Sequence, residues 1–176
     1  MPMVNLKRVL ERINYCTICA EKFKNKKDSP IICSKCGYHH YLSPKPTNAA
    51  ILQNKKREIL FVRRKYPPKK NFWDLPGGFL NINETIEESM TRELEEELGV
   101  RIENIKYFIS TYDSYLYKNV LLATICSIYQ GEVVGKDFIP NDDVLSVKFF
   151  PKSKIPYLKI AFPSLVEVLK KFVMTG

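Results

Sequence analysis

The segment GGFLNINETIEESMTRELEEELGV, residues 77–100, determines how the rest of the chain is interpreted. It opens on a glycine pair, and its later apolar residues recur four apart, which is the spacing of one buried helix face. These residues are Ile86, Met90, Leu94 and Leu98. Gly99 follows at the position where helices commonly end in the left-handed backbone conformation. The segment therefore predicts a glycine turn and then a helix over residues 84–98.

Seven carboxylates and one arginine occupy this segment, which gives it a net charge of −6. At about 100° per residue, Glu93 and Glu97 lie directly beside the apolar face and Glu96 lies a little farther round. Glu87 and Glu95 fall outside that sector and are predicted to be solvated. Three partly buried carboxylates within one helical turn would repel one another and be driven towards protonation. A divalent cation removes this cost, and oxygen ligands on a rigid helix suit Mg²⁺ or Mn²⁺.

The acidic segment lies in an otherwise basic chain, whose formal net charge is +9. Nine basic and three acidic residues give residues 1–47 a charge of +6, and eight basic and two acidic residues give residues 48–76 the same charge. Each charged run has a solvated surface as its ordinary explanation. An acidic patch among basic groups is also what a metal site needs when its substrate is a polyanion.

The fixed residues of this segment match the Nudix box at every specified position. They are Gly78, Glu84, Arg92, Glu93, Leu94, Glu96, Glu97, Gly99 and Val100. The chain therefore resembles the Nudix hydrolase superfamily. The resemblance implies an α/β/α sandwich with a mixed sheet, and an enzyme that hydrolyses phosphoanhydride bonds in nucleotide derivatives with Mg²⁺ or Mn²⁺ as its catalytic cofactor.

The resemblance also implies a metal site on the predicted helix. Glu93, Glu96 and Glu97 match the metal-binding glutamates of the family, and the carbonyl of Gly77 matches a frequent backbone ligand. Many relatives place a further acidic ligand just before a later strand, where this chain has Asp143. A local turn after the preceding proline and asparagine is an equally good explanation for that aspartate.

The reaction implied by the resemblance is in-line attack of a metal-activated water on one phosphorus of a pyrophosphate. The cations would lower the pKa of that water and neutralise the charge that develops on the phosphate oxygens. Glu96, Glu97 or a later carboxylate is the candidate general base. Arg92 matches an arginine that orients neighbouring carboxylates, and Glu84 is its expected bidentate partner.

Strand and helix patterns surround the box on both sides. Strands are predicted at residues 48–53, 58–64, 72–75, 105–115, 120–130 and 144–150. A final helix is predicted from Pro163, a favourable first helical residue, to about residue 173, and a short helix is predicted within residues 6–13. Mixed strands with two or three helices indicate an α/β sandwich.

Two Cys-x-x-Cys pairs, separated by thirteen residues, precede this domain. Their members are Cys16, Cys19, Cys33 and Cys36. Four thiolates at this spacing fill a tetrahedral zinc site and leave no position for a catalytic water, so the zinc is predicted to be structural. His39 and His40 follow closely, and one of them could replace a cysteine ligand, but four thiolates suffice and the two are interpreted as exposed loop residues. The fifth cysteine, Cys126, lies in an apolar run and is predicted to be a small core residue.

These patterns divide the chain into an N-terminal helix with a zinc ribbon, residues 1–46, and a Nudix hydrolase domain, residues 47–176. The ribbon is too small to bury much apolar surface, so zinc would supply its folding energy. We expect it to act as a brace or to form a homodimer. Nucleic-acid contact ranks below these roles because its basic residues are not clearly interleaved with aromatic ones. No transmembrane or signal-peptide pattern occurs in the sequence, so a cytoplasmic enzyme without a membrane partner is expected.

Residues outside the box bear on the nucleotide substrate. The added ribbon resembles the branch that includes NADH pyrophosphatases, but the Ser-Gln-Pro-Trp-Pro-Phe-Pro segment usual in those enzymes is missing from the sequence. Leu116 stands where many ADP-ribose pyrophosphatases have proline, and Tyr117 matches a tyrosine common in dinucleoside polyphosphate hydrolases. The sequence around residues 41–46 and 73–79 is most similar to ADP-ribose pyrophosphatase-like proteins with a ribbon. We therefore predict ADP-ribose or a similar derivative, with NADH and dinucleoside polyphosphates as alternatives.

Several larger side chains near the box are candidates for substrate contact. Arg63 and Arg64 end a strand that approaches the site in relatives, and one of them is predicted to contact a phosphate. Trp73 is interpreted as core packing, while Phe79 and Tyr112 are open between packing and stacking on a base. The rival from another class is a non-catalytic nucleotide-sensing or RNA-associated module. A module that only binds has no need of three glutamates together, so an enzyme is favoured.

Overall fold

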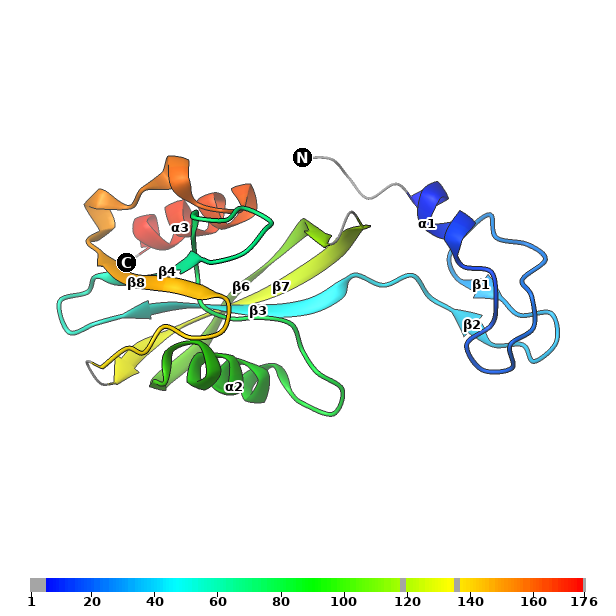
Figure 1. Ribbon diagram of the computed structural model, residues 1–176, viewed down its shortest axis with the longest axis horizontal. Helices are drawn as coiled ribbons and strands as arrows, with labels where there is room; N and C mark the ends of the chain where they lie inside the picture. The colour runs from blue at the N-terminus through cyan, green and yellow to red at the C-terminus, as the bar shows by residue number, and fades with distance from the viewer. Residues whose placement is uncertain (1–5, 118–119, 135–136, 176) are drawn as a thin grey trace.

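The structure, a computed structural model, describes the backbone of residues 6–117, 120–134 and 137–175. The side chains of residues 6, 8 and 117 lie outside this description. The chain forms a small N-terminal module and a larger domain built on one sheet (Figure 1). Helix α1 (Leu6–Arg12) and a two-stranded sheet of β1 (Ile31–Ile32) and β2 (His39–His40) make up the module.

The larger domain contains a six-stranded mixed sheet. Its strands are β3 (Lys45–Gln53), β4 (Ile59–Arg64), β5 (Trp73–Asp74), β6 (Arg101–Tyr117), β7 (Val120–Val134) and β8 (Val144–Phe150). The order is β5-β4-β3-β7-β6, and β8 also pairs with β4. Strand β3 runs parallel to β7, whereas the other pairings are antiparallel. This arrangement confirms the predicted mixed sheet.

Helix α2 (Ile86–Leu98) covers one face of the sheet and α3 (Pro163–Thr175) covers the other (Figure 1). Strand β3 serves both faces, because successive side chains of a strand point in opposite directions. Ala49 and Ile51 pack into the core beneath α3, and Ala50 and Leu52 pack into the core beneath α2. Burial on both faces explains why this strand has a continuous apolar run instead of an alternating one.

The start of α2 differs from the prediction. The helix begins at Ile86, since Thr85 is its N-cap and forms a capping box with Glu88. Glu84 therefore lies in the turn before the helix, not inside its first turn. The end is as predicted, because Gly99 adopts a left-handed conformation with φ of 65°.

Two predicted strands are longer in the structure. Strands β6 and β7 pair along most of their lengths, from Arg101 opposite Val134 to Tyr117 opposite Val120. Both strands extend beyond the apolar residues from which they were predicted, because their backbones stay paired with each other there. Strand β3 begins earlier than the predicted strand over residues 48–53, because residues 45–47 already pair with β7. Two short 3-10 turns, Lys152–Lys154 and Tyr157–Lys159, lead into α3.

The N-terminal module has its own small core. Leu10, Phe23 and Ile31 are buried there together with two cysteines. Within the described part of the chain, no helix has the length and apolar character needed to cross a membrane.

Candidate active site

The glycine turn is fixed to β3 by the main chain. The amide of Ala50 donates to the carbonyl of Pro76 at 2.9 Å, and the amide of Asn48 donates to the carbonyl of Gly78 at 2.9 Å. Gly77 lies between these two bonds with φ of +136°, and a Cβ there would come within 2.5 Å of the Asn48 carbonyl oxygen. Only glycine fits this position. Among the described residues no group donates to the Gly77 carbonyl, so this oxygen is available as the predicted ligand.

Arg92 holds the turn and the acidic helix together. Its Nε and Nη2 donate to the two oxygens of Glu84 at 3.0 and 2.8 Å, which is the bidentate contact expected from the sequence. Its Nη1 donates to Glu93 at 3.0 Å and to Glu96 at 2.9 Å, and Nη2 also reaches the carbonyl of Phe79 at 3.2 Å. These hydrogen bonds lower the pKa of Glu84 to about 2 and raise that of Arg92.

The three candidate metal-binding glutamates occupy different environments. Glu97 is only 5% exposed, Glu93 is half-buried, and Glu96 is exposed. Burial, followed by the charge of Asp143, raises the pKa of Glu97 to about 10. Burial also raises the pKa of Glu93, with Arg92 acting against it. The structure thus brings Asp143, which lies far along the chain, next to the glutamates of the helix.

This group of carboxylates fits a hydrated divalent cation. Glu97 accepts a hydrogen bond from the amide of Gly77 at 3.3 Å, but the aspartate beside it adds negative charge without a compensating cation. A divalent cation would stabilise the ionised form of such a buried carboxyl. Within the described residues, only the four cysteines bring three or more ligand atoms within 4.8 Å of one another, so the carboxylates form an open arrangement. Mg²⁺ suits such a site, because it takes few protein ligands and keeps several waters.

Not every glutamate of the helix matches its predicted role. Glu95 is exposed, as expected. Glu87 is also exposed, but it accepts a 2.7 Å hydrogen bond from the hydroxyl of Tyr129 and is therefore not simply solvated. This bond lowers the pKa of Glu87, and burial raises the pKa of Tyr129 to about 12. The contact joins α2 to β7.

Asn48 and Ser89 support the site and were missed by the sequence prediction. Asn48 is 3% exposed and donates from Nδ2 to the hydroxyl of Ser89 at 2.9 Å. Ser89 is fully buried and also accepts from Nη2 of Arg92 at 3.3 Å. A polar residue inside an apolar strand, and a serine beside the apolar helix stripe, are signals that could have indicated a buried contact.

A cavity of about 150 Å³ lies beside the glycine turn. Arg64 lines it and is tied by its Nη1 to Asp74 at 2.8 Å, by its Nε to the carbonyl of Pro68 and by its Nη2 to the hydroxyl of Tyr115. Arg63 instead donates from Nε to a loop carbonyl and does not line this cavity. The phosphate contact suggested for these arginines stays a prediction.

The remaining large side chains are divided between packing and the cavity. Trp73 packs edge-on against Phe150, with ring centroids 5.2 Å apart, and this contact confirms its interpretation as core packing. Phe79 lines the cavity, whereas Tyr112 is exposed on β6. Cys126 packs against the core beneath α3 and also borders the cavity, where burial raises its pKa to about 11.

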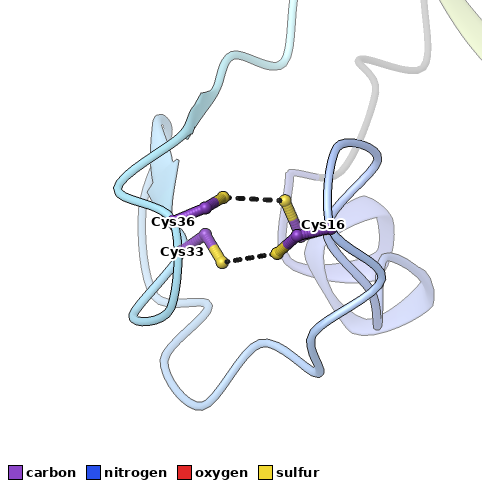
Figure 2. A group of neighbouring side chains, drawn as sticks. Cys16, Cys33 and Cys36 are labelled. Carbon is purple, nitrogen blue, oxygen red and sulfur yellow. Dashed lines mark hydrogen bonds between the residues drawn. The ribbon is translucent and has the colours of Figure 1, made fainter.

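The four N-terminal cysteines form a compact group with the geometry of a zinc site (Figure 2). The Sγ atoms of Cys16 and Cys36 are 3.7 Å apart, and those of Cys19 and Cys33 are 3.6 Å apart. Zn–S bonds of about 2.3 Å in a tetrahedron place the sulfurs about 3.8 Å from one another. His39 and His40 form strand β2 instead of the predicted loop, and they lie outside this group of ligands.

The comparisons with known proteins agree with this geometry. The sequence model of the NUDIX domain family matches residues 44–172. The ADP-ribose pyrophosphatase of Methanocaldococcus jannaschii is 33% identical over 125 residues, which cover 71% of this chain and 71% of the relative. The NAD-capped RNA hydrolase NudC of Haemophilus influenzae is 30% identical over 150 residues, which cover 84% of this chain and 54% of the relative. This chain therefore spans about half the length of that relative.

A solved structure resembles nearly the whole chain. The NUDIX hydrolase from Nitrosomonas europaea superimposes with a TM-score of 0.70 and 26% identity, covering 92% of this chain and 91% of that one. Its coverage includes the N-terminal module as well as most of the larger domain. The family match spans most of the chain, and the glycine turn, Arg92 and the acidic helix of the chain meet in one place. This chain therefore belongs to the Nudix hydrolase family.

Proposed function

We propose that the protein uses Mg²⁺ or Mn²⁺ to hydrolyse the pyrophosphate bond of a nucleoside diphosphate derivative such as ADP-ribose. The buried carboxyl of Glu97, beside Asp143 and within hydrogen-bond distance of the glycine turn, is the observation that carries this proposal. A buried carboxyl beside a second carboxylate is costly to ionise without a cation, so its presence supports a cation-binding site there. The likeness to the ADP-ribose pyrophosphatase of Methanocaldococcus jannaschii supports the choice of substrate.

The residues of the chain have distinct tasks in this proposal. Glu93, Glu96 and Glu97 would hold the cations, together with the carbonyl of Gly77 and with Asp143. The bound cations would supply an acidified attacking water and neutralise the charge of the phosphate oxygens. Either Glu96 or Glu97 would accept the proton of that water.

Arg92 would act by positioning. It contacts Glu84 on the turn and two glutamates on the helix, so it sets the separation between the turn and the carboxylates. The exposed side of the site is acidic, and the cations would make it attractive to a polyanion. Zinc, held by the four cysteines, would have a structural role in the N-terminal module.

A substrate panel tests the proposal. The protein should be assayed with ADP-ribose, NADH, dinucleoside polyphosphates, deoxynucleoside triphosphates and capped RNA, each with Mg²⁺, with Mn²⁺ and with a chelator. ADP-ribose should be cleaved to two monophosphates only when a cation is present. Hydrolysis that is unaffected by the chelator would contradict the metal assignment, and turnover of none of these compounds would contradict the proposed function.

A matched pair of variants tests the role of the buried carboxyl. Glu97→Gln should lower the rate by about 10²-fold or more, since it removes one charged ligand from the site. Glu95→Gln changes an exposed glutamate on the same helix and should retain the wild-type rate. Calorimetric titration with Mn²⁺ should show weaker binding only for Glu97→Gln. Equal rates and equal Mn²⁺ affinities for the two variants would show that Glu97 is not a ligand.

NADH or an NAD-derived cap is the second candidate substrate. The likeness to NudC covers more of this chain than the likeness to the ADP-ribose pyrophosphatase does, and it extends into the N-terminal module. Preferential turnover of NADH or of NAD-capped RNA over ADP-ribose would favour this alternative. A dinucleoside polyphosphate hydrolase and a non-catalytic nucleotide-sensing or RNA-associated module are the further alternatives that the same panel distinguishes.

A further inference from the structure

The cavity beside the glycine turn has a size suited to one ring. It measures about 150 Å³ and is bordered by residues of β3, β4, β6 and β7 and by the start of α3. An apolar cavity of about 150 Å³ holds one benzene molecule. The cavity can therefore enclose a single six-membered ring, and a purine would enter with its six-membered ring first. In the proposed function, the diphosphate group of the substrate lies outside this cavity, at the carboxylates of the helix.

One wall of the cavity is aromatic. Phe79 meets Tyr115 edge-on, with ring centroids 5.5 Å apart, and Tyr115 lies 6.0 Å from Phe162 at an interplanar angle of 34°. The guanidinium of Arg64 lies 5.8 Å from the centroid of Tyr115 and 5.4 Å from that of Phe162. These rings come from the turn, from β6 and from the segment before α3. Such a wall favours a planar ring, because flat π-systems stack or pack edge-on against it.

The charges around the cavity oppose a phosphate. Of the carboxylates that border it, Asp143 is assigned to the cations in the proposed function, which leaves Asp74 and Asp113; Arg64 is the basic residue of the lining. Arg64 already forms an ion pair with Asp74 at 2.8 Å. The charge that remains after this ion pair is negative, so the lining of the cavity would repel an anionic group of the substrate. The occupant is therefore the uncharged or hydrogen-bond-donating end of a substrate.

Asp113 supplies the polar recognition group. This residue of β6 is 7% exposed, and its Oδ1 accepts from the amide of Ser114 at 2.6 Å. Its Oδ2 accepts from the hydroxyl of Ser164, at the start of α3, and Thr124 donates to its carbonyl. A carboxylate has about four acceptor sites, so two remain for a ligand. Because an ionised carboxylate can only accept, the group that binds it has to be a donor.

Building on the proposed function, we propose that this cavity binds a planar ring bearing an amino or carboxamide group, whose N–H donates to Asp113. Asp113 is then a specificity-determining residue. Two ends of nucleotide derivatives have this chemistry: the exocyclic amine of adenine and the carboxamide of nicotinamide. A ring that lacks the donor, or that carries a carboxylate in its place, leaves Asp113 without its partner and is rejected.

Calorimetric binding of four mononucleotides distinguishes these sources without any hydrolysis. AMP is compared with purine riboside 5′-monophosphate, which has a hydrogen atom in place of the amine, and nicotinamide mononucleotide is compared with nicotinic acid mononucleotide. In at least one pair, the compound bearing the donor should bind about tenfold or more tightly, which is the size of one hydrogen bond to a charged group. The pair that shows the preference identifies which ring the cavity holds.

Variants then assign the preference to one side chain. Asp113→Asn should reduce the discrimination within the pair to less than about threefold, because the new amide also offers a donor. Asp137→Asn, at an exposed aspartate, should leave it unchanged. Phe162→Leu should weaken both members of the pair by similar factors, because the ring packs against the ligand without reading its amine. This difference separates recognition from a general structural effect.

Two results would overturn the inference. One is equal or undetectable binding within both pairs by the wild-type protein, and the other is a tenfold preference that survives in Asp113→Asn. If Asp113→Asn fails to fold, the wild-type comparison decides the question alone. A protein that hydrolyses ADP-ribose but shows no preference would refute only this inference. A preference without any hydrolysis in the substrate panel would refute the proposed function and leave the inference standing.

Discussion

A single methyl group added at Gly78 should impair catalysis while leaving the fold intact. A Cβ at this position would overlap the carboxylate of Glu93, meeting its Cδ and both of its oxygens. Gly78 does not have a positive φ, so alanine is compatible with its backbone. Non-bonded atoms normally lie about 3.5–4.0 Å apart, which means that the carboxylate has to move by about 1 Å or more.

The expected magnitudes follow from which atoms have to move. The Glu93 carboxylate is the end of a flexible side chain, so Gly78→Ala should change the free energy of unfolding by less than about 1 kcal/mol, within the range of unstrained glycine-to-alanine changes. Misplacing a reacting group by about 1 Å costs about 10²-fold in rate. We therefore expect a folded protein with a rate lowered by about 10²-fold and weaker Mn²⁺ binding.

The neighbouring glycine provides the contrasting variant. At Gly77 a Cβ would meet backbone atoms, 2.5 Å from the carbonyl oxygen of Asn48 and 2.8 Å from Cα of Ala49, and φ is +136°. The backbone of β3 cannot move aside without breaking its sheet pairing. Gly77→Ala should therefore destabilise the fold by about 3 kcal/mol or more.

Urea unfolding and steady-state rates on the preferred substrate of the panel measure both effects. Wild-type activity in Gly78→Ala would refute the reasoning, because Glu93 would then be unnecessary or differently placed. Wild-type stability in Gly77→Ala would show that the close approach of the turn to β3 is wrong.

Three other outcomes are expected. Burial raises the pKa of Asp74 to about 6, so between about pH 4 and pH 6 the folded state keeps a proton that the unfolded state has released. The contribution of this group to the free energy of unfolding should therefore fall by about 3 kcal/mol as pH rises through that window. Urea unfolding at pH 4 and pH 7 should show this loss in the wild type and lack it in Asp74→Asn. Removal of zinc by a chelator should unfold the N-terminal module, from α1 to β2, while the domain from β3 onwards stays folded, as NMR amide spectra would show; one cooperative loss of both would argue against two domains. Asn48→Ala should lower the free energy of unfolding by about 1 kcal/mol, because the buried hydroxyl of Ser89 loses one of its two donors and keeps only Arg92, and an unchanged urea midpoint would contradict this contact.

The parts of the site that lie on one helix were predictable from the sequence. A period of about 3.6 residues places Glu93 and Glu97 beside the apolar stripe without knowledge of the rest of the fold. The start of the same helix was placed too early, at Glu84, because Thr85 and Glu88 form a capping box that the periodicity does not reveal. The prediction of which helix face is buried uses an average over many residues, whereas the prediction of where the helix begins depends on the single side chain that caps it.

Contacts between distant segments were harder to predict. The proximity of Asp143 to Glu97 was suggested only by the family resemblance, since nothing in the local pattern before β8 requires it. Asn48 was not recognised because its partner lies 41 residues away, on a helix that packs across the sheet. Asp113 is polar in a strand whose outward and inward faces were not distinguished by the sequence. The position of Asp113 depends on the register of β6 with β7, whereas Asp143 precedes β8 and depends on its pairing with β4.

The attachment of the glycine turn to β3 has a consequence for how such a protein can change over time. The two bonds that hold the turn join main-chain atoms of Asn48 and Ala50 to those of Pro76 and Gly78. Main-chain bonds persist through most substitutions, whereas the aromatic wall of the cavity depends entirely on side chains. Mutations at Tyr115 or in the segment before α3 can therefore alter which ring is accepted without loosening the turn. Substrate specificity can therefore change during evolution while the glycine turn, and with it the proposed catalytic site, is retained.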